Sequence, residues 1–342
     1  MNSKITAEFN NIIKEHKMSL NKNDFHQFIN GLYQAEGTTG AYFKKKESLS
    51  IRFNFSIGQN YSPEALDVLL NLQKILGIGK IKLELSMKNQ LHIRYKVSNT
   101  EDIFNKVIPY FSLLYGQKRK DVFSLKKVYE LSNIEYSKLD NSFISELIHL
   151  VYSTNPEGKK RKLLLKEKLN QFNCSFSSYY NLKVEENNNL PSKLFIIGLF
   201  LGDGSIGFVF DSPPSRFPRF YIKLLFNFAA QSSNVQLLKL IAKKMNLKPQ
   251  IYKRKSGMLG LEFTGKTVFE VIMPFLAEHI KWLFWRKDRF IYVQKIVNMF
   301  KNKDHLSKEG LKSIIDLLYS KPNKYLKPKE YWIVLIDKRV WE

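Results

Sequence analysis

The sequence predicts an α+β protein of two pseudo-symmetric αββαββα repeats, each built around a four-stranded antiparallel sheet. The first observation is an internal repeat: Glu36 is matched by Asp203, and segment 119–123 by segment 286–290, each 167 positions later. The second is the alternation of apolar and polar residues in several short segments of each copy. The third is an apolar, glycine-containing helical pattern that ends at Glu36 in one copy and at Asp203 in the other.

In the first copy, the helix ending at Glu36 precedes a strand in which Ile51, Phe53 and Phe55 alternate with polar residues. Pro63 at a first turn and Gly77 after the last apolar residue mark the start and stop of a second helix. Further helices close the unit. The predicted elements after the first helix are strands 39–45 and 50–57, helix 63–76, and a hairpin of strands 80–85 and 91–96.

The second copy shows the same order, with a proline-rich loop at 211–218 between its first two strands. Its predicted later elements are strand 220–228, helix 234–245, and a hairpin of strands 250–255 and 258–263. We therefore divide the chain into a first repeat at 1–156, a linker at 157–190, and a second repeat with a C-terminal tail at 191–342.

Composition narrows the class of protein. Lysine and arginine exceed aspartate and glutamate by 24, and this excess is spread along the chain, which favours a polyanionic partner such as nucleic acid. A single cysteine, Cys174, excludes an internal disulfide and a zinc-finger framework. The longest apolar run, 194–201, is far too short to span a membrane, and the N-terminus lacks a signal-peptide core, so no membrane association is expected.

Small residues recur with a spacing of four in the two motif helices, at Gly31 and Ala35 and at Gly198 and Gly202. This spacing lines one helix face, so the two backbones are expected to approach closely. The two helices would then bring their terminal acids together, where both carboxylates face negative helix ends. Divalent cations between them, with Mg²⁺ favoured by hard oxygen ligands, would offset this repulsion. For a single copy, a helix-ending turn would be the simpler interpretation.

The paired segments 29–37 and 196–204 resemble the LAGLIDADG helices of the homing endonucleases, in the single-chain, two-repeat, intron-encoded form. The segment 305–311 is similar to one found in intron-encoded members. Gln34 and Leu201 replace the motif's first acid, which is not the catalytic one. The resemblance implies a monomer that makes a double-strand break at one long, pseudo-palindromic DNA site by metal-dependent phosphodiester hydrolysis. The chain is also rich in Lys, Asn, Ile, Phe and Leu, as AT-rich genomes tend to encode, which favours an organelle genome, with the mitochondrion preferred over the chloroplast.

The resemblance further assigns site residues. It implies that Mg²⁺, or Mn²⁺ or Ca²⁺ in the same sites, is held by Glu36 and Asp203 with the backbone carbonyls of Ala35 and Gly202. The remaining predicted catalytic residues are the basic Lys120 and Lys287 near the scissile phosphates, and the glutamines Gln59 and Gln231. The two lysines could equally touch backbone phosphates elsewhere. The expected base-reading set is Tyr42, Lys44, Arg52, Asn54, Lys82, Arg94, Arg219, Lys223, Tyr252 and Arg254.

Three other functions compete with the nuclease hypothesis. A maturase that binds its host intron RNA uses the same scaffold in some family members, and loss of a motif acid would favour it. Both acids, Glu36 and Asp203, are retained. The second function is that of a DNA-binding regulator, and the third is that of a basic structural RNA-binding protein. Neither of these two explains a pair of acids in register on glycine-faced helices.

Overall fold

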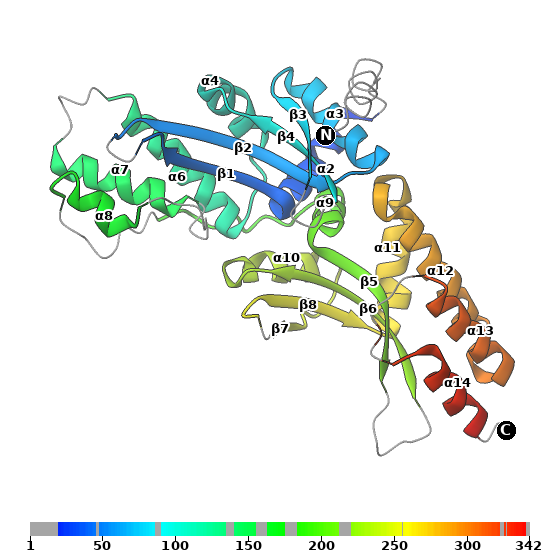
Figure 1. Ribbon diagram of the computed structural model, residues 1–342. Coiled ribbons are helices and arrows are strands. Elements are labelled where there is room, and N and C mark those ends of the chain that lie inside the picture. Colours follow the sequence, from blue (N-terminus) through cyan, green and yellow to red (C-terminus); the bar gives the residue numbers. More distant parts are fainter. Residues whose placement is uncertain are drawn as a thin grey trace. The chain divides into compact units, whose positions relative to one another are not determined.

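The computed structural model describes residues 20–45, 48–85, 90–134, 140–154, 163–174, 183–211, 220–254, 256–321, 325 and 327–339. The chain forms two compact units. Unit 1 comprises Met1–Gly202 and Ser233–Ile241, and unit 2 comprises Asp203–Ser232 and Ala242–Glu342. Each unit contains a four-stranded sheet with helices packed on it (Figure 1), which confirms the predicted α+β class.

The sheet of unit 1, sheet A, is antiparallel with the strand order β1-β2-β4-β3. Side chains alternate between its faces, so directly paired residues share a face. One face is apolar and buried, and includes Phe53, Phe55 and Tyr95. Its strands are β1 (Gly37–Phe43), β2 (Ile51–Asn60), β3 (Lys80–Leu85) and β4 (Leu91–Val97).

The second helix of unit 1 begins and ends at the predicted residues because both signals are local. The Ser62 hydroxyl accepts a hydrogen bond from the Ala65 N–H at 3.1 Å, and Gly77 adopts a left-handed φ of 66°. The helices of unit 1 are α2 (Lys22–Glu36), α3 (Pro63–Leu76), α4 (Thr100–Asp102), α5 (Ile108–Tyr110), α6 (Gly116–Ser132), α7 (Asn141–Ser153), α8 (Leu165–Asn170) and α9 (Lys193–Asp203), the last residue of which opens unit 2.

The sheet of unit 2, sheet B, repeats the topology with the order β5-β6-β8-β7. Its strands are β5 (Gly204–Asp211), β6 (Tyr221–Ala230), β7 (Ile251–Lys253) and β8 (Leu259–Thr264). The strand β7 is shorter than predicted. The helix α10 (Val235–Lys244) belongs to unit 1 up to Ile241 and to unit 2 from Ala242. The larger helices of unit 2 are α11 (Met273–Glu278), α12 (Lys287–Lys301), α13 (Lys308–Tyr319) and α14 (Lys329–Lys338).

Short 3₁₀ segments lie in unit 2 at η6 (Ile280–Trp282), η7 (Phe284–Arg286) and η8 (Asp304–Leu306), while in η4 (Ser232–Asn234) only Ser232 belongs to unit 2. The two units also share a π-helical segment at the same place, η1 (Ile103–Val107) and η5 (Val268–Ile272). Each is followed by a proline, Pro109 or Pro274, whose missing N–H interrupts the regular helical ladder. This irregularity supports the internal repeat independently of the sheets.

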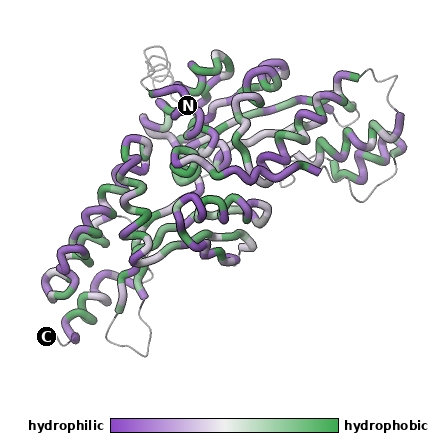
Figure 2. The backbone as a smooth tube through the Cα atoms, turned by 180° about the vertical axis from the view of Figure 1, so that it is seen from behind, coloured by the Kyte–Doolittle hydropathy of each residue, from purple (hydrophilic) through white to green (hydrophobic). Residues whose placement is uncertain are grey.

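Aromatic side chains form much of each core. In unit 1, the buried Tyr33 ring stacks on Phe55 at 4.9 Å between ring centroids and lies 4.6 Å from the Phe111 ring. In unit 2, Phe210 stacks on Trp332 at 4.4 Å, which anchors α14, a helix in the tail that the sequence left unassigned. Figure 2 shows hydrophobic and hydrophilic residues interleaved along the helices, as expected for helices with one buried face.

The predicted boundaries of the repeats and linker stay a prediction. The compact units divide the chain differently, because α9 up to Gly202 belongs to unit 1 although it begins the second sequence repeat. Arg219 and residues 157–162 of the predicted linker lie outside the described residues. No described helix combines the length and apolar character needed to cross a membrane.

Candidate functional site

The helices α2 and α9 pack together inside unit 1 through their glycines. A methyl group on Gly31 would lie 1.9 Å from the carbonyl oxygen of Phe195, and one on Gly198 would lie 2.0 Å from the carbonyl oxygen of Phe28. Real Cβ atoms essentially never approach a neighbour within 3.0 Å. The predicted close approach of the two backbones is therefore confirmed.

The same packing continues to the C-terminal ends of the two helices. A Cβ on Gly202 would lie 2.4 Å from the Ala35 Cβ and 2.9 Å from the Cγ of Glu36. Glu36 is half-buried and is the last residue of α2, while Asp203 is exposed, ends α9 and is the next residue after Gly202. Each acid thus stands at a helix C-terminus, directly before the first strand of its sheet.

A basic residue reaches the end of α2, and it is Lys118 of α6 rather than the predicted Lys120. The Lys118 ammonium donates a hydrogen bond to the carbonyl oxygen of Gly37, the residue after Glu36, and lies 5.6 Å from the centre of the Tyr33 ring. Lys120 is exposed on the same helix. The role predicted for Lys120 stays a prediction, and the sequence did not single out Lys118 within the basic cluster 118–120.

The way α6 begins explains why Lys118, and not Lys120, reaches the end of α2. Gly116 adopts a φ of +50°, and a Cβ there would lie 2.2 Å from the Asn234 side-chain oxygen, which also accepts the Gln117 N–H at 3.3 Å. Only glycine fits this conformation and this approach. Gly116, two residues before Lys118, was therefore the sequence signal that could have identified Lys118 as the basic residue nearest the end of α2.

The hydroxyl of Tyr33 is buried next to this region without a hydrogen-bond partner among the described residues. Burial raises the pKa of Tyr33 well above its ordinary value, and the nearby carboxylate of Asp121 raises it further. The Asp121 carboxylate accepts a hydrogen bond from the Gln117 side chain at 2.8 Å. The phenol therefore stays neutral and does not serve as a base here.

In unit 2, a different basic residue reaches the corresponding strand. Arg289 of α12 donates through Nε to the carbonyl oxygen of Ile206 at 3.4 Å, and its guanidinium lies against Gly207. Lys287, the predicted residue, is exposed two positions earlier, and Gln231 is exposed after β6. The roles predicted for Lys287 and Gln231 stay predictions.

Sheet A presents one polar face. Register places Tyr42 opposite Arg52, and Lys82 opposite Arg94, all on that face together with Asn54. Tyr42, Arg52 and Lys82 are exposed, as is Lys44 just beyond β1, so these residues could reach a ligand laid across the strands. The side-chain oxygen of Asn54 is buried and lacks a hydrogen-bond partner among the described residues.

Gln59 lies on the opposite face of sheet A. It pairs with Ile93, which is fully buried, and its side-chain nitrogen is buried without a partner in the described part of the chain. This placement argues against direct contact with DNA, since the residues expected to read bases point the other way. A catalytic role for Gln59 stays a prediction.

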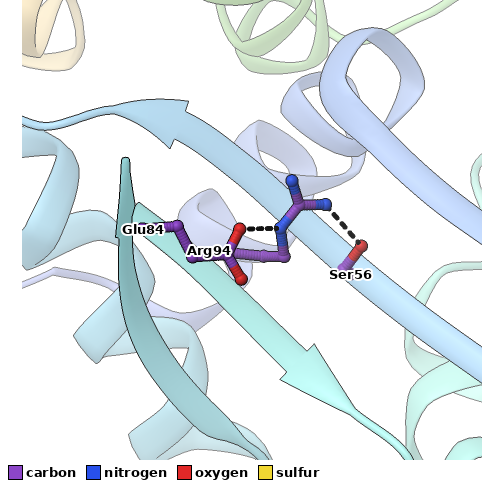
Figure 3. A network of polar contacts seen from close by, with 3 residues as sticks. All are labelled: Ser56, Glu84 and Arg94. Atoms are coloured by element: carbon purple, nitrogen blue, oxygen red, sulfur yellow. Dashed lines mark hydrogen bonds and ion pairs between the residues drawn. The ribbon is translucent and has the colours of Figure 1, made fainter. Parts of the chain in front are cut away.

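A polar network holds Arg94 on this face (Figure 3). Its Nε donates to the Glu84 carboxylate at 3.2 Å and its Nη1 contacts the Ser56 hydroxyl at 3.5 Å. Ser56 is buried below the guanidinium, whereas the side chains of Arg94 and Glu84 are 35% and 43% exposed. The guanidinium is therefore fixed on one side and accessible on the other.

Sheet B also gathers its predicted residues on one face. Lys223 pairs with Val209 and is bound to the carboxylate of Asp211, while Tyr252 pairs with Gly260. Arg254 donates through Nη2 to the Asn227 side chain at 3.1 Å. This face is less polar than its counterpart, because Val209, Leu225 and Ala229 also lie on it.

Known proteins share the sequence pattern. The family model described as LAGLIDADG endonuclease matches residues 29–129. A probable intron-encoded endonuclease 2 of Neurospora crassa is 27% identical over 308 residues, covering 86% of this chain and 64% of that protein. A probable intron-encoded DNA endonuclease 1 of Mycosarcoma maydis is 26% identical over 208 residues, covering 57% of this chain and 73% of that protein. The chain thus spans less than two thirds of the Neurospora relative.

Solved structures share the fold. I-SmaMI bound to an uncleaved DNA target in the presence of calcium ions has a TM-score of 0.69 and 23% identity, covering 88% of this chain and 98% of that one. The I-LtrWI LAGLIDADG homing endonuclease bound to target DNA has a TM-score of 0.71 and 22% identity, covering 90% and 100%. The LAGLIDADG endonuclease model thus matches part of the first repeat, and the two sheets and their helices share the fold of the solved LAGLIDADG structures over most of the chain.

Proposed function

We propose that this chain is a site-specific endonuclease that makes a double-strand break in a long, pseudo-palindromic DNA target by metal-dependent phosphodiester hydrolysis. One observation carries the proposal: two helices packed through glycines each end on a carboxylate, Glu36 or Asp203, directly before a sheet with an exposed polar face. The names of the fungal relatives, and the DNA targets bound by I-SmaMI and I-LtrWI, support it.

The donors at the helix ends suit a hard divalent cation. The proposed ligands, the carboxylates of Glu36 and Asp203 with the helix-terminal carbonyls of Ala35 and Gly202, would supply oxygen donors only. Mg²⁺ is commonly held by one or two carboxylates together with waters and phosphate oxygens, and Mn²⁺ or Ca²⁺ accept similar ligands. When bound, such an ion supplies Lewis-acid chemistry at a phosphoryl oxygen. Among the described residues, no group of three His, Cys, Asp or Glu side chains forms a separate metal site.

The chain's basic residues would stabilise charge on the reacting phosphate. The Lys118 ammonium lies at the end of α2 beside Glu36, where a cation would favour the negative charge that develops during hydrolysis. Arg289 brings a guanidinium to the start of sheet B. The exposed Lys120 and Lys287 suit contacts to phosphates along the DNA backbone.

Double-stranded DNA is the proposed partner of both polar sheet faces. Two-stranded and larger β surfaces fit the major groove, where arginine reads guanine and asparagine reads adenine. The excess of 24 basic residues supplies attraction to phosphates whatever the sequence. Two related sheets in one chain would read two half-sites, so the chain is proposed to act as a monomer. Light scattering on the protein with one DNA duplex tests this, and a mass with two chains would contradict it.

The cleavage test uses a randomised duplex library with Mg²⁺. The wild type is expected to cut a small set of sequences, whereas Glu36→Gln and Asp203→Asn bind the same sequences without cutting them. Measuring binding and cleavage on the same recovered sites separates a lost reaction from a lost fold. A wild type that binds but never cuts would contradict the proposal, as would acid variants that cut at the wild-type rate.

We also propose that the protein works in an organelle, with the mitochondrion favoured over the chloroplast. Its relatives in Neurospora crassa and Mycosarcoma maydis are named as intron-encoded, and both organisms are fungi. Immunodetection in purified mitochondria against a cytosolic fraction tests the location. Recovery only in the cytosolic fraction would contradict it.

A further inference from the structure

Each sheet fixes one arginine above the same position of its long central strand. In sheet A, Arg94 contacts Ser56, which pairs with Thr38 of the first strand. In sheet B, Arg254 contacts Asn227, which pairs with Ser205 of the first strand. Thr38 and Ser205 are each the second residue of their strand, after Gly37 and Gly204, so Ser56 and Asn227 occupy equivalent positions.

The two arginines nevertheless come from different strands. In sheet A, Arg94 on β4 pairs with Lys82 on β3, and in sheet B the equivalent pair is Gly260 with Tyr252. Arg254, two residues after Tyr252, therefore corresponds to Glu84, two residues after Lys82. The internal duplication preserved the place of the guanidinium while exchanging the strand that supplies it.

In each sheet, the position equivalent to the other sheet's arginine holds a different kind of residue. In sheet A the outer strand supplies Glu84, which accepts from Arg94 Nε at 3.2 Å. In sheet B the inner strand supplies Gly260, and the Tyr252 ring lies 2.6 Å from where a Cβ would stand. The Arg254 Nε is buried there with no partner among the described residues. Among the described residues, Arg94 is therefore held by two hydrogen bonds, whereas Arg254 has one hydrogen bond and a contact at 5.8 Å with the Tyr252 ring.

The two anchors of Arg94 leave a defined part of its guanidinium for a ligand. An arginine has five N–H groups. Glu84 accepts a hydrogen bond from the Nε–H, and Ser56 accepts one from an N–H of Nη1. The N–H groups that remain for a ligand are therefore on the two terminal nitrogens, Nη1 and Nη2. That pair has the spacing that guanine O6 and N7 accept in the major groove. Phosphate would accept the same pair, so geometry alone leaves two acceptors on DNA.

Glu84 is out of place on a surface that binds DNA, because its negative charge repels phosphate. An exposed ion pair adds little to folding stability. Its position against Nε of Arg94 is better explained by orientation: a guanidinium held along one edge cannot rotate to follow a neighbouring phosphate. The acid therefore favours the base edge over the backbone.

We propose that Arg94 reads a guanine in the half-site covered by sheet A, and that Glu84 is a positioning residue that makes this contact base-specific. Arg254 makes the equivalent but less discriminating contact in the half-site covered by sheet B. The inference rests on the proposed function, since it requires a DNA target with two half-sites.

The test selects binding sites from a randomised duplex library, using the Glu36→Gln background so that bound DNA stays intact. Three further variants are compared in that background: Arg94→Ala, Glu84→Gln and the matched control Glu101→Gln, an exposed acid on α4 outside the strands. The measurements are the base preference at every position and the affinity for the best site across a series of salt concentrations.

A bidentate arginine discriminates guanine from other bases by roughly 5- to 150-fold. The Arg94→Ala variant should lose a guanine preference at one position. Glu84→Gln should weaken the same preference by about fivefold or more, up to its complete loss, while changing affinity for the best site far less, and Glu101→Gln should change neither.

Several results would overturn the inference. If Arg94→Ala weakens all sequences equally and lowers the salt slope by about one, Arg94 contacts phosphate. If Glu84→Gln leaves every base preference intact, Glu84 is not a positioning residue. If the Glu36→Gln background variant still enriches one target sequence, either of these two results refutes only this inference and leaves the proposed function standing. A library without any enriched motif would refute both.

Discussion

Substitution of Gly198 by alanine tests the helix packing most directly. The added methyl group would lie 2.0 Å from the Phe28 carbonyl oxygen and 2.7 Å from the Leu32 nitrogen, whereas ordinary contact begins at 3.4 Å. Both obstacles are backbone atoms, which cannot rotate aside as a flexible side chain would. The helices α2 and α9 must therefore separate for the methyl group to fit.

The expected cost follows from this geometry. Overpacking a core costs about 1–3 kcal/mol, and backbone obstacles place this site at the upper end. Alanine also improves helix propensity by about 1 kcal/mol, which opposes the clash. The free energy of unfolding should thus fall by about 2 kcal/mol, which lowers the melting temperature by roughly 4–8 °C in a unit of this size.

Thermal and urea unfolding of the full chain measure the effect. The matched control is Gly40→Ala, because a Cβ at Gly40 meets no atom within 4 Å and its φ is not in the left-handed region. The control should be unchanged or slightly more stable, since alanine restricts the unfolded chain. The reasoning is refuted if Gly198→Ala unfolds at the same temperature as Gly40→Ala.

Three further predictions concern single side chains. Lys118→Met should slow cleavage by about 10²-fold with binding retained, whereas Lys120→Met should mainly reduce the salt dependence of binding; equal cleavage rates would contradict the role of Lys118. Tyr33→Phe removes a buried hydroxyl without a partner among the described residues, so urea unfolding should show about 1 kcal/mol of added stability, and a loss would reveal a hidden partner. Burial lowers the pKa of His149 below its ordinary 6.5, so the unfolded chain binds the proton more tightly and stability should fall as pH drops through this range. In His149→Gln, the melting temperature should fall less between pH 8 and pH 5 than in the wild type. An unchanged dependence of the melting temperature on pH would show that His149 is not its cause.

Elements marked by local signals were predictable from sequence. The helix Pro63–Leu76 has the predicted bounds because Ser62, Pro63 and Gly77 act within one turn of its ends. Alternation placed the apolar face of sheet A correctly, and the repeat at one offset gave the shared topology of the two sheets. Spacing of the glycines also predicted the close packing of α2 and α9.

Features that depend on contacts between distant segments were not predictable. The choice of Lys118 over Lys120 depends on how α6 begins, and that is set by Gly116 against Asn234, more than a hundred residues away. The face of sheet A on which Gln59 lies is also set by its pairing with Ile93 on a strand more than thirty residues later. The contact between Arg254 and Asn227 likewise joins segments whose register only the folded sheet fixes.

Because α9 belongs to unit 1, cutting the chain before α9 would give two fragments that each contribute a helix to the same unit. A break between Cys174 and Lys183 would leave α2 on the first fragment and α9 on the second, although the glycines of these helices pack within one unit. The second fragment would thus carry its own docking helix, and the two pieces would reassemble without a covalent link. A split version of the protein should therefore be divided between Cys174 and Lys183. A hybrid that joins the halves of two relatives at this point needs glycine faces on α2 and α9 that fit each other.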